Sequence, residues 1–181
     1  MKMSPAKLFV TLALLATTAA AQLGTTKATR VTLVPVTPVT MTRASSAKLE
    51  LTFRVAPGYH VNSNKPNSPL LIPTVLHLDM PTDLSAAKID YPAGEDKTFP
   101  FSPDDKLNVY TGDVSISAML NTGKEIVPGR YRVHGYLKYQ ACDNRACYPP
   151  AQLPLAFDVQ VVKGGPKPVR KNPAQSPHVH G

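Results

Sequence analysis

The two cysteines of this chain, Cys142 and Cys147, are the residues whose type and spacing point most directly to chemistry. Four residues separate them, so a disulfide between them closes a small local loop. In the chain-entropy model such a loop stabilises a fold by about 2 kcal/mol, against about 5 kcal/mol for a loop of about 100 residues. A purely structural bond would gain more by joining distant strands. The spacing therefore favours a bond that is made and broken, which is thiol–disulfide exchange.

The residues on either side of the pair indicate how it is held. Residues 129–139 alternate apolar and polar side chains like a strand that leads to Cys142, and this pattern turns Tyr139 toward a core. After Cys147 comes Tyr148-Pro149-Pro150, in which proline fixes φ and removes amide donors. We expect Tyr148 to flank the pair and the rigid exit to hold the two sulfur atoms within bonding range.

The rest of the central region has the same period of two. Strong alternation marks residues 49–55, 114–120 and 155–161, and weaker candidates are residues 29–34, 59–62, 74–79 and 87–91. Turn signals separate these runs, and the 19 prolines argue against long helices. About seven to nine short strands in one domain predict an all-β, immunoglobulin-like two-sheet β-sandwich. A closed barrel is the lesser alternative.

The first 21 residues have the features of a secretory signal peptide. Lys2 and Lys7 supply the positive start, residues 8–16 are almost all apolar, and three alanines precede a cleavage position at Gln22. A retained N-terminal anchor is the alternative, although the apolar run is too short to span a bilayer. Export predicts a periplasmic protein whose mature chain has no transmembrane segment, in a compartment where disulfides persist.

Charge and composition exclude several classes of function. The net charge is +8, but residues 22–162 hold 14 Lys/Arg and 12 Asp/Glu, so that region carries only +2 and shows no nucleic-acid footprint. We expect residues 22–163 to form the folded domain and residues 164–181 to be a disordered basic tail. We expect no metal and no cofactor, because scattered carboxylates and histidines, including the pair His178 and His180 in the tail, form no convergent set.

Two motifs resemble a known family. Tyr139-Gln140-Ala141-Cys142 and Cys147-Tyr148-Pro149-Pro150 resemble the Y-Q-x-C…C-Y-P-P signature of the N-terminal periplasmic domain of the thiol:disulfide interchange protein DsbD. Residues 58–66 are similar to the G-(W/Y)-H-x-N-S-N-x-P segment of many members. The resemblance covers roughly residues 28–162.

The resemblance implies a function and a set of partners. In the family, an immunoglobulin-like domain takes electrons from a thioredoxin-like domain fed by a membrane domain. It passes them to periplasmic proteins that reduce wrong disulfides or serve cytochrome c biogenesis. The sequence ends at residue 181, so we expect thioredoxin-like periplasmic partners and a membrane electron donor, both supplied in trans to a monomer. The spacing between the cysteines is shorter by one than in the best-known member.

Three residues near the cysteines are candidates for modulating their reactivity. A guanidinium at Arg145 within a few ångströms would favour a thiolate, while Asp143 would oppose this effect or pair with Arg145. The alternative is that both are solvated loop charges. By the resemblance alone, His60 lies beside Cys142 as a proton donor or acceptor; the alternative is an exposed or capping histidine. His60 and Asn62 occupy positions where the best-known member has tyrosines.

Residues 95–101 resemble the loop that in the family covers the cysteines as a cap. The resemblance makes Phe99 or Phe101 the aromatic shield, held by a contact of about 0.3–1.5 kcal/mol that a partner can displace. The alternative is that both are ordinary core phenylalanines.

Two interpretations of the whole chain follow. The leading one is a thiol:disulfide interchange component, a redox domain that relays reducing equivalents between thioredoxin-like partners. The second is a non-catalytic envelope interaction module with a structural disulfide, which a reduction potential below about −300 mV would favour. The sequence leaves open which cysteine reacts with a partner, and in which direction electrons flow.

Overall fold

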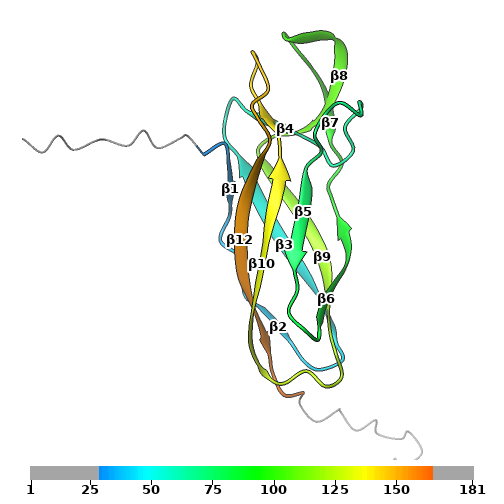
Figure 1. Ribbon diagram of the computed structural model, residues 1–181, viewed down its shortest axis with the longest axis vertical. Coiled ribbons are helices and arrows are strands. Elements are labelled where there is room, and N and C mark those ends of the chain that lie inside the picture. Colours follow the sequence, from blue (N-terminus) through cyan, green and yellow to red (C-terminus); the bar gives the residue numbers. More distant parts are fainter. Residues whose placement is uncertain (1–28, 165–181) are drawn as a thin grey trace, which may run out of the picture.

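Alternating apolar and polar residues build the long strands of the molecule. The computed structural model describes residues 29–164 (Figure 1), and its long strands are β3 (Ser46–Val55), β9 (Asp113–Thr122), β10 (Gly129–Tyr139) and β12 (Ala151–Val161). Along most of their length, buried residues alternate with residues that reach solvent, as one core-facing side requires. The four strongest predicted strands are therefore confirmed.

Two four-stranded sheets form a sandwich around these strands. In the first, β3 and β9 lie between β1 (Val31–Leu33) and β6 (Leu84–Asp90), and all neighbours are antiparallel. In the second, β12 and β10 lie between β2 (Val39–Met41) and β5 (Val75–Asp79), and β2 runs parallel to β12. This arrangement confirms the predicted all-β, immunoglobulin-like sandwich.

A third sheet, which the sequence did not predict, lies at one end of the sandwich (Figure 1). Its order is β11 (Ala141–Cys142), β4 (His60–Asn62), β8 (Ser102–Tyr110) and β7 (Glu95–Phe99). Only β4 corresponds to a predicted strand, and residues 95–101 were expected to be a loop. They form β7 and the turn into β8, because residues 102–106 belong to β8, which pairs with β7, although these residues are polar, include a proline and are mostly exposed.

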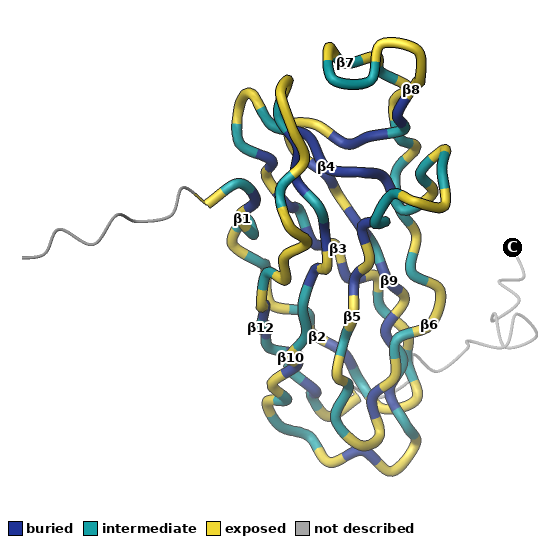
Figure 2. The backbone as a smooth tube through the Cα atoms, turned by 45° about the horizontal axis from the view of Figure 1, so that its top comes forward, coloured by how far each residue is buried: buried dark blue, intermediate teal, exposed yellow. Residues whose placement is uncertain are grey.

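Apolar side chains from both sheets of the sandwich fill its interior. The largest fully buried ones include Leu51, Phe53, Ile116, Leu120 and Val133, and Figure 2 shows the buried residues running through the middle of the sandwich. Burying one such side chain contributes about 1.5–3 kcal/mol. The body therefore supplies a rigid scaffold for the third sheet.

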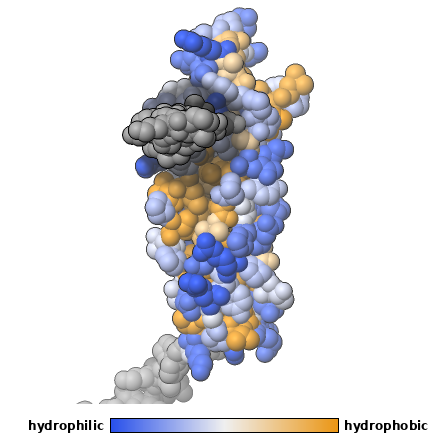
Figure 3. Space-filling model, turned by 60° about the vertical axis from the view of Figure 1, so that its left-hand side comes forward, coloured by the Kyte–Doolittle hydropathy of each residue, from blue (hydrophilic) through white to orange (hydrophobic). Residues whose placement is uncertain are grey.

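The surface beside β1 combines apolar and hydrophilic areas (Figure 3), and residues 34–38, which connect β1 to β2, line shallow grooves there. Within residues 29–164 the structure contains no helix long and apolar enough to cross a membrane. The predicted signal peptide, residues 1–21, and all of the predicted tail except Gly164 lie outside the described residues.

Candidate redox site

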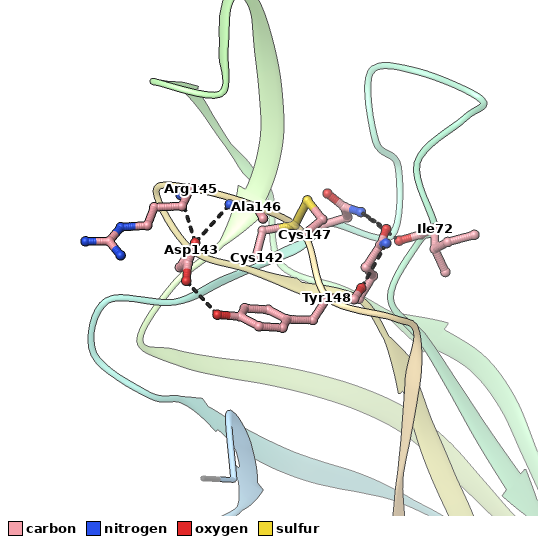
Figure 4. Close-up of a disulfide and its surroundings, with 9 residues drawn as sticks. Ile72, Cys142, Asp143, Arg145, Ala146, Cys147 and Tyr148 are labelled. Atoms are coloured by element: carbon pink, nitrogen blue, oxygen red, sulfur yellow. Dashed lines mark hydrogen bonds between the residues drawn. A yellow bond between two sulfur atoms is a disulfide. The ribbon is translucent and has the colours of Figure 1, made fainter. Parts of the chain in front are cut away.

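The two cysteines form a disulfide at the end of the molecule that carries the third sheet. Cys142 ends β11 and pairs with Cys147 as an isolated bridge, with the two Cα atoms 4.0 Å apart (Figure 4). Cys142 is fully buried, whereas Cys147 is exposed. Of the two cysteines, Cys147 is therefore the one in contact with solvent.

Hydrogen bonds fix the loop between the cysteines without help from the disulfide. The Asp143 amide donates to the carbonyl of Ala146 (3.0 Å), and the Tyr148 amide donates to the carbonyl of Ala141 (2.9 Å). One oxygen of the Asp143 carboxylate accepts the amides of Arg145 (2.8 Å) and Ala146 (3.0 Å). Since these bonds do not involve sulfur, reduction leaves the contacts that keep the thiols close.

Tyr148 ties this loop to the beginning of the domain. Its hydroxyl donates to the second oxygen of Asp143 at 2.7 Å. This bond, followed by the two backbone amides, lowers the pKa of the Asp143 carboxyl to about 2. The guanidinium of Arg30, just before β1, lies 3.6 Å from the centre of the Tyr148 ring, a cation–π distance. Sequence reasoning missed Arg30, because nothing in its neighbourhood along the chain links it to the cysteines.

A second network joins the segment after Cys147 to two other parts of the chain. The side-chain amide of buried Asn62 donates to the carbonyl of Ile72 (3.0 Å) and to the side chain of Gln140 (3.3 Å). Gln140 in turn donates to the carbonyl of Tyr148 (3.1 Å). Both Asn62 and Gln140 stand in the two family motifs, which is the sequence signal that marked them without revealing their role.

His60 lies on β4 directly opposite Cys142 in the antiparallel pair of β4 and β11. Its side chain is buried, with 2% of the residue exposed, and its Nε2 has no hydrogen-bond partner among residues 29–164. Burial, and after it the positive charge of Lys97, lowers the pKa of His60 to about 4, while the negative charge of Asp143 opposes both effects. The imidazole is therefore neutral at physiological pH.

The two phenylalanines of residues 95–101 stack over His60. The Phe99 ring lies 3.8 Å from the imidazole centre at an angle of 13°, and Phe101 lies 5.6 Å from Phe99. Both side chains are half-buried, and neither belongs to the hydrophobic core. The β7–β8 turn thus places two aromatic rings over His60, which lies opposite Cys142 in the sheet.

The structure does not bring Arg145 to the sulfur atoms. Its side chain is exposed and extends away from the disulfide (Figure 4). Asp143 accepts the backbone amide of Arg145, and the described residues contain no ion pair between the two side chains. Tyr139, in contrast, is buried in the core as predicted.

Comparison with known proteins identifies the family. The family model described as "Thiol:disulfide interchange protein DsbD, N-terminal" matches residues 30–157. The chain belongs to this family. No curated protein matches the chain.

Two solved structures resemble this DsbD N-terminal family member. One is the reduced DsbD N-terminal domain of Neisseria meningitidis, with 22% identity over 65% of this chain and 82% of that one, and a TM-score of 0.43. The other is the N-terminal periplasmic domain of ScsB from Proteus mirabilis, with 15% identity over 65% of this chain and a TM-score of 0.43. The match spans 43% of that ScsB chain.

In this DsbD N-terminal family member, three buried side-chain nitrogen or oxygen atoms have no hydrogen-bond partner within residues 29–164, and all belong to residues around the disulfide. They are Nε of Arg30, Nε2 of His60 and Oδ1 of Asn62. Unpaired buried polar atoms are costly and uncommon in folded proteins. A disulfide with this surrounding fits thiol–disulfide interchange.

Proposed function

We propose that this chain relays reducing equivalents between thioredoxin-like proteins by thiol–disulfide exchange at Cys142 and Cys147. The observation that carries the proposal is the asymmetry of the pair: one cysteine is exposed and the other fully buried, in a loop that hydrogen bonds hold by themselves. We place the relay in the periplasm, where exchange partners and oxidised cysteines coexist and to which the signal-like residues 1–21 would direct it.

The exchange proceeds in two steps. A thiolate of the donor attacks the sulfur of Cys147, a mixed disulfide forms, and Cys142 leaves with the electron pair as a thiolate. The second cysteine of the donor then attacks the donor sulfur that is bonded to Cys147 in the mixed disulfide, and Cys147 is released as a thiolate. The donor ends as a disulfide, and this chain has gained two electrons, which it passes to an acceptor disulfide by the reverse sequence.

The stacked phenylalanines give the relay a means of selection. Phe99 and Phe101 lie at the cysteine end outside the core, so displacing them does not require unfolding the sandwich. A protein partner contributes enough contacts to displace them, whereas a small thiol does not. We therefore assign these rings the role of a movable cover that limits nonspecific reduction.

A trapping experiment tests the proposal. The Cys142→Ser variant keeps only Cys147, and the Cys147→Ser variant keeps only Cys142, which makes them a matched pair. Each is mixed with a thioredoxin-like protein whose single active-site cysteine carries a thionitrobenzoate leaving group. We expect the Cys142→Ser variant to form the mixed disulfide at least about tenfold faster, because the accessible sulfur reacts first.

The contrary outcome is equally clear. If neither variant forms the mixed disulfide faster than an unrelated exposed thiol does, the relay proposal fails. The disulfide would then be structural, and the chain would be an interaction module of the cell envelope.

A further inference from the structure

The side chains of His60 and Cys142 are neighbours on one face of the third sheet. The two residues are directly opposite in the antiparallel pair of β4 and β11, and directly opposite side chains point to the same face with Cβ atoms about 4.5–5.5 Å apart. His60 is 2% exposed and Cys142 is 0% exposed. The imidazole and the buried sulfur therefore share one water-poor compartment.

With the disulfide intact, the Nε2 atom of His60 has no hydrogen-bond partner in the described part of the chain, residues 29–164. Leaving such an atom buried and unpaired lowers the stability of the fold. Reduction turns the Cys142 sulfur into a thiol, which is a donor, or a thiolate, which is an acceptor. Either form offers the neighbouring imidazole a hydrogen bond that the disulfide cannot offer.

Among the groups packed around the imidazole, the imidazole itself is the one available to accept a proton from Cys142. Phe99 covers one face of the ring at 3.8 Å. Lys97 on β7 is positively charged, and Asp143 after β11 already accepts three hydrogen bonds. His60 also borders an open groove of about 350 Å³ lined by Tyr59, Lys97, Phe99 and Asn144 among others, through which a proton can reach solvent.

We propose that His60 is the proton acceptor for Cys142 when Cys142 resolves the mixed disulfide. The inference rests on the proposed function and adds an acid–base group to it. His60 takes the proton from the Cys142 thiol, and the Cys142 sulfur attacks the Cys147 sulfur. The bond between Cys147 and the partner breaks, and the partner's sulfur leaves with the electron pair. The Cys142–Cys147 disulfide is restored, and the acceptor has been reduced by two electrons.

A single-turnover measurement on the reduced protein tests this step with a small probe. 5,5′-Dithiobis(2-nitrobenzoate) reacts with Cys147 and leaves thionitrobenzoate on its sulfur, and attack by Cys142 releases this second thionitrobenzoate, which is followed by absorbance in a stopped-flow instrument. An unassisted thiol reacts in proportion to its thiolate fraction, so its rate rises about tenfold per pH unit below a thiol pKa of about 8.5. A neutral imidazole that takes the proton instead makes the rate independent of pH.

We expect the second release from the wild-type protein to be nearly constant between about pH 5 and pH 7.5, since His60 is neutral throughout this range and the ordinary thiol pKa of about 8.5 lies above it. The His60→Gln variant should lose the plateau, rise about tenfold per pH unit, and be about 100-fold slower at pH 6, because general base catalysis contributes at least this much. His77→Gln, a change at an exposed histidine on β5, is the matched control and should keep the wild-type profile.

Two results would overturn the inference: a wild-type rate that already rises tenfold per pH unit, or a His60→Gln variant that keeps the plateau. The wild-type profile decides the matter even if the variant does not fold. The measurement needs no protein partner. A plateau together with failed trapping by the thioredoxin-like protein would therefore disprove the proposed function and leave the role of His60 intact.

Discussion

In the body of the sandwich, β3 and β9 bury apolar side chains such as Phe53 and Ile116, which alternate along each strand with residues that face outward. At the disulfide end, β4 has no outward face, since His60, Val61 and Asn62 are all buried. Figure 2 shows this strand as one continuous buried segment beneath exposed loops. The body gains stability from packing, whereas the end buries polar groups that are only partly satisfied.

This difference indicates where the molecule has been shaped for stability and where for chemistry. Burying an unpaired polar atom lowers stability, so a sequence that keeps three of them around one disulfide gives up stability there. Such local conflicts with the rules of packing are typical of functional sites. The sandwich tolerates them because most of its apolar core lies in the long strands β3, β9, β10 and β12.

The largest difference in stability between the two regions is expected when one phenylalanine in each region is replaced by alanine. Phe53→Ala removes a fully buried core ring and should lower the free energy of unfolding by about 3–5 kcal/mol. Phe99→Ala removes a half-buried ring that stacks on His60, and should lower it by about 0.5–1.5 kcal/mol. Urea titrations of both variants, in the oxidised form, measure the two losses.

Reactivity should separate the same two variants in the opposite order. Phe99→Ala should speed reduction of the disulfide by dithiothreitol severalfold, because the cover is gone, while Phe53→Ala should leave this rate unchanged under conditions where it is folded. A Phe99→Ala variant that loses stability on the scale of Phe53→Ala, with no gain in reactivity, would show that Phe99 is a core residue.

Lowering the pH is expected to reduce the free energy of unfolding by a smaller amount than Phe53→Ala does. The pKa of His60 is lowered from 6.5 to about 4 in the folded protein, so between these values the unfolded chain binds a proton that the folded protein does not. Stability contributed by neutral His60 is therefore fully present above pH 6.5 and falls by about 3 kcal/mol as the pH drops to 4. Urea titrations at pH 7, 5.5 and 4 measure this loss.

The His60→Gln variant is the control, because glutamine does not titrate and should remove most of the slope in that window. Asp143 does not interfere, since its pKa is lowered to about 2 and its contribution is lost only below pH 4. A wild-type slope that survives in His60→Gln would show that His60 is not the buried titrating group.

The sequence predicted the body of the molecule better than its chemical end. Residues 49–55, 114–120 and 155–161 alternate strictly because one face of each strand packs on the core, so the pattern alone predicted β3, β9 and β12. The cysteine pair and its motif also predicted the disulfide and the family.

The rest depended on contacts that no local pattern records. β7 is rich in charged residues, β8 begins with a charged, proline-containing segment, and the two pair only with each other and β4, so residues 95–101 were interpreted as a loop and β8 was not predicted. Arg30 reaches Tyr148 across more than a hundred residues of chain, a distance that a pattern of neighbours cannot bridge. Arg145 was placed near the sulfurs by its position between the cysteines, yet its side chain extends outward.

The central claim is that the loop of Cys142 and Cys147 keeps its shape without the disulfide, and comparing the unfolding of oxidised and reduced protein tests it most directly. Urea titrations with and without a dithiol reductant should show a reduced protein that is fully folded and less stable by about 2 kcal/mol, the value for so short a loop. The double variant Cys142→Ser/Cys147→Ser should behave like the reduced protein. A reduced protein that is already unfolded without urea would contradict the account and make the disulfide structural.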